Sequence, residues 1–459
     1  MDMAIALPCV AQFVIVLDVT IVAIALPAVQ ADLGLSTTAL GWLVTTYTLV
    51  FGGCLLAAGR LADRTGRRRA FTGGLLLFAT ASLVCGLAPS GTALLTARAV
   101  QGCGAALVSP AALALITVAR PEGPARARAM GWWTAVAAGG GASGWILGGL
   151  ISDALGWRWV FLVNVPICVG AALLSRRVLP EHRDPSAAPL DLAGAALAIT
   201  GLSATLLALA LAERHGPLAG APLAVSTVAV ALLAALQRVE GRAARPLLDG
   251  AILRRGSVAT PSVVAAVLTA TTTPPMFLCI LHAQRVLDLG PSAAGLLFPP
   301  FNAAVVAGSL AGPRLGAAVG ELRAMAGGLA SVAAGALALL AIAPDAPAVP
   351  SMLGGFVLLG GGLGVASVAS TSMGTAALGR DDQGMASGLL ATCAQLGTSL
   401  GLAAIVPVAV ARAQAAGGGA AGQVAGFELG FVGSAAVAAG AAVAVAAIAL
   451  RGNPRADRP

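Results

Sequence analysis

Gly59-Arg60-Leu61-Ala62-Asp63-Arg64-Thr65-Gly66-Arg67-Arg68-Arg69 is the stretch that decides the fold of this sequence, because it lies between two long apolar runs. It holds five arginines and one aspartate. Charged side chains at this density are too costly to place in hydrocarbon, whereas an apolar run of about 20 residues can cross a bilayer as a helix. The stretch therefore predicts a water-exposed turn between two membrane-spanning helices.

The composition of the whole chain is that of a membrane protein. Of 459 residues, 58% are hydrophobic and 10% are charged, and the mean hydropathy is +0.91. Soluble domains contain about 25% charged residues, so we expect an all-α integral membrane protein. A net charge of +8 would suggest a nucleic-acid partner for a soluble protein. Here an excess of arginine in cytoplasmic loops accounts for it, and no nucleic acid is expected.

Fourteen apolar segments are long enough to be transmembrane helices. They predict an N-terminal six-helix bundle at 1–178, a two-helix insert with cytoplasmic linkers at 179–256, and a C-terminal six-helix bundle with a short cytoplasmic tail at 257–459. The segments are 5–28, 39–61, 70–88, 93–119, 129–153, 158–178, 191–211, 221–239, 257–281, 291–313, 324–343, 351–376, 384–409 and 428–450.

The arginines predict the orientation of these helices. All 27 basic residues are arginine, and alternate assignment of the loops puts 22 of them on one side of the membrane. Basic residues collect in cytoplasmic loops, and an even number of spans puts both termini on one side. We therefore expect a multi-pass protein of the cytoplasmic membrane with both termini in the cytoplasm. Arg98 lies inside a span, and the far side receives Arg158, Arg214, Arg285 and Arg412.

Two charged residues inside predicted spans are candidates for function. Asp18 lies in the first span, where a carboxylate is costly unless it faces a polar interior or a counter-ion. Arg98 lies in the fourth span and shares a helix face with Gln101. Burial favours the neutral form of a carboxyl group and a nearby cation favours the charged form, so such a pair could exchange a proton. The alternatives are a structural contact between helices and, for Arg98, a side chain that reaches the membrane surface.

Four glycines in the fifth span predict close helix packing. Gly140, Gly144 and Gly148 recur every four residues, and Gly149 follows the last of them. Small residues at this spacing form a smooth stripe along which a second helix can approach to backbone contact.

Polar and aromatic side chains within the spans are candidates for lining a substrate cavity, although tryptophans near span ends are often interfacial anchors. The sequence has no P-loop, zinc-protease or nucleophile-elbow motif. Neither enzyme activity, a cofactor nor a metal is therefore predicted. The candidates are Gln12, Tyr47, Gln101, Trp133, Trp145, Asn302 and Gln395.

Five stretches together resemble the fourteen-helix drug:proton antiporter family of the major facilitator superfamily. Gly59 to Arg69 is similar to its signature loop between helices two and three, and Arg98 to Gly102 resembles its fourth-helix motif. Leu17 to Pro27 resembles its first-helix motif. Trp157 to Pro166 looks like the segment that opens helix six, and Gly384 to Leu389 resembles the opening of helix thirteen.

The resemblance implies the major facilitator fold, with two six-helix bundles, two extra helices and 14 transmembrane helices. It implies a monomeric, proton-coupled efflux antiporter that exports lipophilic small molecules such as antibiotics by alternating access. The family's fourth-helix arginine is implicated in proton transfer, which implies coupling through Asp18 and Arg98. The signature loop is implied to be a gating latch made by Gly59, Asp63, Arg64, Gly66, Arg67 and Arg68.

Three departures from the family pattern bear on the substrate and the gate. Trp145 stands where the fifth-helix motif usually has proline, and the second-half copy of the signature loop has Ala317 in the position of Asp63. No Asp or Glu is expected deep in the ninth to fourteenth spans, which favours neutral or weakly charged substrates over dications. Uptake or uniport of a small solute, and a non-transporting membrane scaffold or receptor, are the alternative functions.

Overall fold

The computed structural model of the protein describes residues 2–119, 124–181, 192–215, 219–242, 256–344, 347–376 and 383–451. Every regular element in these ranges is a helix, and each of the fourteen predicted spans coincides with one helix or with a helix broken in two. Among them, eleven are long and apolar enough to cross a membrane, or twelve if the two bent halves of the Thr37–Thr65 helix form one span. The number fourteen for the membrane crossings stays a prediction.

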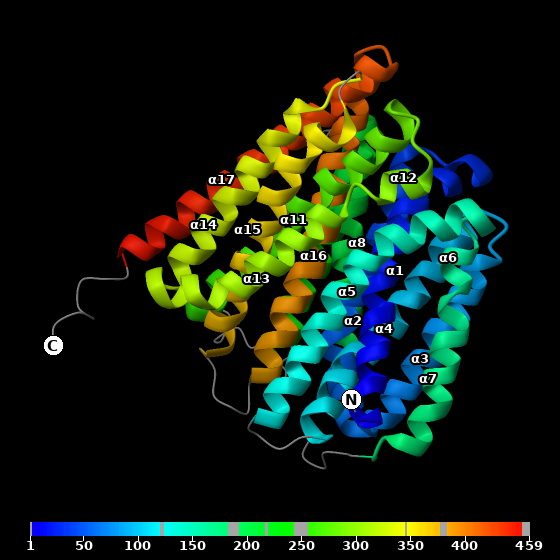
Figure 1. Ribbon diagram of the computed structural model, residues 1–459, viewed down its shortest axis with the longest axis vertical. Coiled ribbons are helices and arrows are strands. Elements are labelled where there is room, and N and C mark those ends of the chain that lie inside the picture. The colour runs from blue at the N-terminus through cyan, green and yellow to red at the C-terminus, as the bar shows by residue number, and fades with distance from the viewer. Residues whose placement is uncertain are drawn as a thin grey trace. The chain divides into compact units, whose positions relative to one another are not determined.

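The chain forms two compact units, the first made of Met1–Asp249 and Leu289–Leu296. In this unit α1 packs against α4 and α5, and α4 packs against α2 and α3, which is in turn covered by α7 (Figure 1). Its helices are α1 (Met3–Leu33), α2 (Thr37–Thr65), α3 (Arg67–Gly86), α4 (Gly91–Ala119), α5 (Pro124–Leu155), α6 (Trp159–Leu162), α7 (Asn164–Val178), α8 (Leu192–His215), α9 (Gly220–Arg242) and α12 (Pro291–Gly295).

Small residues let α4 lie in the middle of the first unit. A Cβ atom added to Gly102 would lie 2.7 Å from the carbonyl oxygen of Tyr47 on α2. A Cβ atom added to Gly104 would lie 2.7 Å from the backbone nitrogen of Phe78 on α3. In lipid, helix association depends on such close packing rather than on the hydrophobic effect. The two glycines therefore set how near α2 and α3 come to the polar face of α4.

The second unit is made of Gly250–Asp288 and Leu297–Pro459. Here α15 lies between α13 and α14, and α11 packs against α15, α16 and α17. The glycine-rich segment of α15 explains the close fit, because a Cβ atom on Gly364 would lie 2.7 Å from the backbone nitrogen of Ser309 on α13. The elements are α11 (Gly256–Leu281), the π-helix η1 (His282–Val286), α13 (Pro299–Val319), α14 (Glu321–Ala338), the 3₁₀-helix η2 (Leu339–Ala341), α15 (Ala348–Ala376), α16 (Gln383–Ala415) and α17 (Ala420–Arg451).

Proline explains two predicted helices that the structure divides. The predicted helix 158–178 is broken at Val163, three residues before Pro166, which has no N–H for a helical bond. The predicted helix 291–313 becomes α12 and α13, and α13 starts at Pro299, because proline fits the first turn of a helix, where its missing N–H leaves no helical bond unmade. The structure thus separates a short helix, α12, from the long one that follows it.

The last helix starts earlier than predicted. The glycine-rich run before residue 428 reads as a loop, and Gly417 and Gly418 indeed have positive φ values of 93° and 72°. However, α17 begins at Ala420, directly after this turn. Glu428 therefore lies about two turns inside the helix and not at the first residue of the span, as predicted.

The two compact units do not test the predicted division of the chain into two bundles and an insert, with boundaries at 178/179 and 256/257. The helices of the predicted insert, α8 and α9, belong to the first unit, where α8 also packs against α2. Much of the predicted linkers, at 182–191 and 243–255, lies outside the described residues. A separate two-helix insert stays a prediction.

Candidate functional site

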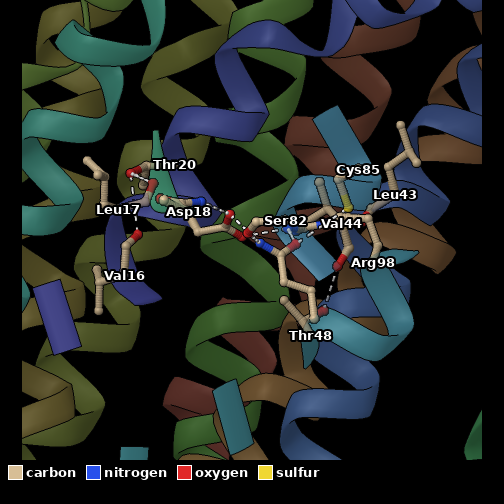
Figure 2. Close-up of polar contacts among 12 residues, drawn as sticks. Val16, Leu17, Asp18, Thr20, Leu43, Val44, Thr48, Ser82, Cys85 and Arg98 are labelled. Carbon is tan, nitrogen blue, oxygen red and sulfur yellow. Dashed lines mark hydrogen bonds and ion pairs between the residues drawn. The ribbon is translucent and has the colours of Figure 1, made fainter. Parts of the chain in front are cut away.

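Asp18 on α1 and Arg98 on α4 form an ion pair inside the first unit. Arg98 Nη1 donates to Asp18 Oδ2 at 2.5 Å, and both side chains are 0% exposed (Figure 2). Removing two charges from water carries a large desolvation cost, which is offset only when the geometry is good and the remaining polar atoms are bonded. The neighbours of this pair therefore decide whether it is stable.

Neutral side chains from two helices bind Asp18, and one from a third helix supports them. Asp18 Oδ1 accepts from Gln101 Nε2 at 2.8 Å and from Asn164 Nδ2 at 2.9 Å. Gln101 Nε2 also donates to Ser82 Oγ at 2.7 Å. These residues come from α4, α7 and α3 and each is 0% exposed. The carboxylate is thus bound by one cation and two amides, as a charged carboxylate requires in a dry interior.

Arg98 is held on several sides besides the carboxylate. Its Nη1 also donates to Gln101 Oε1 at 2.7 Å, and its Nε donates to the carbonyl oxygen of Leu43 at 3.2 Å. The guanidinium carbon lies 4.2 Å from the ring centroid of Tyr47 and 5.9 Å from that of Phe161. Such cation–π contacts are stronger when the cation is desolvated. Arg98 is therefore fixed within the unit and does not reach the membrane surface.

One ion pair joins the helices of this cluster. Asp18 on α1 is bonded to Arg98 and Gln101 on α4 and to Asn164 on α7. In a low-dielectric interior the bonds of such a connected polar network strengthen one another. The packing of α1, α4 and α7 therefore depends on the bonds that Asp18 makes.

Sequence reasoning did not assign a role to Asn164 or Ser82. Asn164 entered the sequence analysis only as part of the Trp157 to Pro166 segment. That segment makes hydrogen bonds to α1 at two positions, Asp32 and Asp18. Trp157 Nε1 and Arg158 Nη1 both donate to Asp32 Oδ2, at 3.1 and 2.6 Å, while Asn164 donates to Asp18. A polar residue at a proline-broken helix start within the membrane is the signal that could have identified Asn164.

In the signature loop, α2 ends and α3 begins around Gly66. Asp63 Oδ1 accepts from Arg67 Nε at 2.9 Å, a pair at i and i+4. Gly66 has a φ of 114°, a backbone conformation that residues with a side chain rarely adopt. Arg64 is exposed. Gly59 lies one turn before the acid, and a Cβ atom added to it would lie 3.7 Å from Cβ of Pro110 on α4.

Glu181 is a partner of the loop that sequence reasoning missed. Its Oε2 lies 3.5 Å from Nε of both Arg68 and Arg69. Arg68 Nη1 also donates to the carbonyl oxygen of Leu179 at 3.2 Å, just beyond the end of α7. A Cβ atom on Gly66 would clash with the Glu181 carboxylate. The loop is thus bonded to the residues that follow α7. An acidic residue directly after an apolar helix is the sequence feature that could have identified Glu181 as a partner of the loop.

The α5 glycines contact two different helices. Cβ atoms on Gly140 and Gly148 would lie 2.8 Å from Phe13 O and 2.9 Å from Ile21 O of α1, and one on Gly144 would clash with Thr20. Gly149 instead faces α12, where its Cβ would lie 2.6 Å from the carbonyl oxygen of Pro291.

Trp145, in the position of the family's proline, is buried, and its carbonyl oxygen lies against Gly295 of α12. Asp153 Oδ2, farther along α5, accepts from the backbone nitrogen of Ser292 at 2.9 Å. The end of α5 is therefore a seat for α12 as well as a neighbour of α1.

Replacing Gly140 with valine is expected to destabilise the first unit, because the new side chain meets the backbone of α1 and not a flexible side chain that could move aside. Overpacking of this kind costs about 1–3 kcal/mol. The loss of thermal stability of purified protein in detergent measures it. Gly139→Val is the matched control, since no atom lies within 4 Å of a Cβ at Gly139. Equal effects of the two substitutions would contradict the packing assignment.

The other candidate cavity residues are spread over both units. Tyr47 and Gln101 belong to the Asp18–Arg98 cluster, and Gln12 Oε1 accepts from Ser109 Oγ of α4 at 3.2 Å. Trp133 packs against apolar core residues of the first unit. Asn302 and Gln395 are half-buried in the second unit, on α13 and α16. Contact of any of these residues with a substrate stays a prediction.

Comparison with known proteins agrees with this architecture. Residues 9–402 match the Major Facilitator Superfamily. The cephamycin export protein CmcT of Amycolatopsis lactamdurans is 40% identical over 88% of this chain and 84% of its own length. The puromycin resistance protein pur8 of Streptomyces alboniger is 39% identical over 86% of this chain and 78% of its own.

More distant similarities extend the comparison. The multidrug resistance protein Stp of Mycobacterium tuberculosis is 33% identical over 87% of this chain and 74% of its own length. The crystal structure of a bacterial homologue of the human lysosomal transporter Spinster has the same fold, with a TM-score of 0.70 at 17% identity, covering 99% of this chain and 98% of that one.

Proposed function

The chain belongs to the Major Facilitator Superfamily, and from this premise we propose that it is a proton-coupled antiporter that exports lipophilic small molecules, antibiotics among them, across the cytoplasmic membrane. The observation that carries the proposal is the fully buried Asp18–Arg98 ion pair. A carboxylate that is buried from bulk solvent and bonded to side chains of α4 and α7 is a group whose protonation can be coupled to a conformational change. Family and fold point to transport rather than catalysis.

The proposed cycle alternates between protonated and substrate-bound states. A proton on Asp18 neutralises the acid, weakens its bond to Arg98 and favours one facing state, while loss of that proton favours the other. The two halves of the molecule rock about a central site in transporters of this kind. The movement of one proton across the membrane releases about 1.4 kcal/mol per pH unit of gradient and about 2.3 kcal/mol per 100 mV of membrane potential. One proton per cycle is therefore sufficient to drive strong accumulation of a substrate.

The names of the relatives support export and guide the choice of substrates to test. They are proteins of cephamycin export, puromycin resistance and multidrug resistance. On that basis we propose that lipophilic antibiotics are substrates of this protein as well. The sequence favours neutral or weakly charged substrates, and Glu428, inside α17, is a reason to test cationic compounds beside them. Fourteen crossings, cytoplasmic termini and a monomeric state are further parts of the proposal.

Everted membrane vesicles test the function directly. With an acid interior, vesicles that contain the protein are expected to accumulate puromycin, and collapse of the pH gradient should release it. Uptake of a solute by the same fold would require the opposite gradient, and uniport would be insensitive to it. A scaffold or receptor would show no transport of any compound in an antibiotic and dye panel, and that result would exclude the proposed antiport.

We also propose that the signature loop is a latch that stabilises one facing state. Replacing Asp63 with asparagine removes the charge that holds Arg67, and the pair is partly exposed, so the protein should stay folded. We expect turnover to fall several-fold while the substrate concentration for half-maximal rate changes little. Steady-state efflux from proteoliposomes measures both quantities. Unchanged turnover would show that the loop is only a topological element.

A further inference from the structure

Three polar atoms next to Asp18 have no hydrogen-bond partner within the described part of the chain. They are Tyr47 Oη, Arg98 Nη2 and Asn164 Oδ1, and each of these side chains is 0% exposed. Buried polar atoms without a partner are rare in native proteins, and each one asks for an explanation such as an internal water molecule. Three of them in a single cluster indicate a binding site.

The three atoms are complementary in chemistry, and their side chains belong to the one cluster around Asp18 and Arg98. Arg98 Nη2 can only donate, Asn164 Oδ1 can only accept, and a tyrosine hydroxyl does both. The Tyr47 ring lies 4.2 Å from the guanidinium carbon of Arg98, and the amide nitrogen of Asn164 lies 2.9 Å from Asp18 Oδ1. A buried water molecule makes about three hydrogen bonds, so one bond to each of these three atoms would satisfy it.

The bonds of Asp18 show where a proton can attach. Each carboxylate oxygen has two lone pairs. Oδ1 already accepts from Gln101 and Asn164, whereas Oδ2 accepts only from Arg98 among the bonds found in the described residues. A proton therefore has an open position at Oδ2, on the side of the carboxylate that faces Arg98.

We propose that Tyr47, Arg98 and Asn164 hold a water molecule that delivers protons to Asp18. In the transfer, an O–H bond of the held water breaks as an O–H bond to Asp18 Oδ2 forms, and the water oxygen takes a replacement proton from a hydronium ion on the proton-delivering side; the water ends neutral, and Arg98 keeps its protons and its charge. Tyr47 and Asn164 are positioning residues, because they hold the carrier and do not themselves give up the proton. The inference rests on proton coupling at Asp18, which is part of the proposed function.

A hydroxyl group of the substrate has the same hydrogen-bonding chemistry as water. The complete burial of all three side chains favours water, which is the smaller ligand. The two sources make different kinetic predictions. Removal of a water carrier slows turnover, whereas removal of a substrate contact weakens substrate binding.

Tyr47→Phe is the decisive variant, because it removes the hydroxyl and keeps the ring over Arg98. Turnover in proteoliposomes should fall about tenfold, at the low end of what a positioned proton-transfer group contributes. The half-saturating substrate concentration should stay within about twofold. The loss should shrink as the pH on the proton-delivering side is lowered, since a higher proton concentration compensates for slow delivery. A merely structural role of the hydroxyl would not move this pH profile.

Thr48→Val is the matched control. It removes a hydroxyl from the next residue of α2, one that already donates to the carbonyl oxygen of Val44 at 3.1 Å within its own helix. Turnover of this variant is expected to match that of the wild-type protein at each pH. A Tyr47→Phe protein with wild-type turnover and pH profile overturns the proposal, and so does one with weakened substrate binding and unchanged turnover.

A density map that resolves ordered water tests the site without any transport. One water peak within hydrogen-bond distance of Tyr47 Oη, Arg98 Nη2 and Asn164 Oδ1 is expected in the wild-type protein, and its loss is expected in Tyr47→Phe. Direct bonds among the three side chains, with no water between them, overturn the proposal. If a pH gradient drives no transport by the wild-type protein, the proposed function fails. The density map then still shows whether a water molecule is bound at this site.

Discussion

Replacing Asp18 with asparagine is expected to abolish efflux driven by a pH gradient. The amide has nearly the shape of the carboxyl group, but it can neither take up nor release a proton near neutral pH. Its oxygen can still accept from Gln101 and Asn164, while its nitrogen faces the donor Nη1 of Arg98. The variant should therefore resemble a state fixed at one charge, in which coupling is lost.

The test is efflux from proteoliposomes with and without an imposed pH gradient. Loss of gradient-driven efflux should be accompanied by retained exchange of labelled for unlabelled substrate, which needs no net proton movement. Retained exchange also shows that the protein is folded. Efflux by the asparagine variant at the wild-type rate and with the wild-type response to pH would end the assignment of Asp18 as the coupling group.

Replacing Arg98 with methionine is expected to have the largest effect on stability. It leaves the carboxylate of Asp18 charged and fully buried without a cation. Breaking a buried ion pair from one side costs about 3–5 kcal/mol, most of it from the charge that is left behind. Adding Asp18→Asn should therefore restore much of the loss, because the double variant contains no buried charge at this position.

Denaturation of the four proteins in detergent measures the coupling between the two substitutions. Arg158→Met is the matched control: Arg158 pairs with Asp32 at 2.6 Å, but the side chains are 41% and 46% exposed. An exposed pair contributes about 0–1 kcal/mol, so this control should be nearly neutral. A small effect of Arg98→Met, or a double variant that is worse than both singles, would contradict the strongly coupled pair.

The helices of this protein could be predicted because each is a long apolar run, and the charged turn at Gly59 to Arg69 separates two of them. Their breaks were harder to predict, since a proline such as Pro166 can bend, break or simply begin a helix. The start of α17 was misplaced for a similar reason. Alanine and glycine between 420 and 427 are compatible with both a loop and a closely packed helix.

The candidate site shows the same limit at the level of contacts. Asp18 and Arg98 could be singled out because charge inside a span needs a partner. Asn164 could not be paired with Asp18, because an apolar run does not say which helices are neighbours. Gly149 illustrates what periodicity alone can add: it lies about 100° around the helix from Gly148. That rotation already indicates a second contact face, although only the structure identifies α12 as the helix on it.

The position of α12 has a consequence for how the protein is made. This short helix is encoded in the second half of the chain, after α11, yet it belongs to the first unit and covers Gly149 and Asp153 of α5. Chains emerge from the ribosome with the N-terminal end first and their domains generally fold as units. Here the first unit cannot be completed until Leu289–Leu296 has been synthesised, which is after α11 of the second unit has already been made.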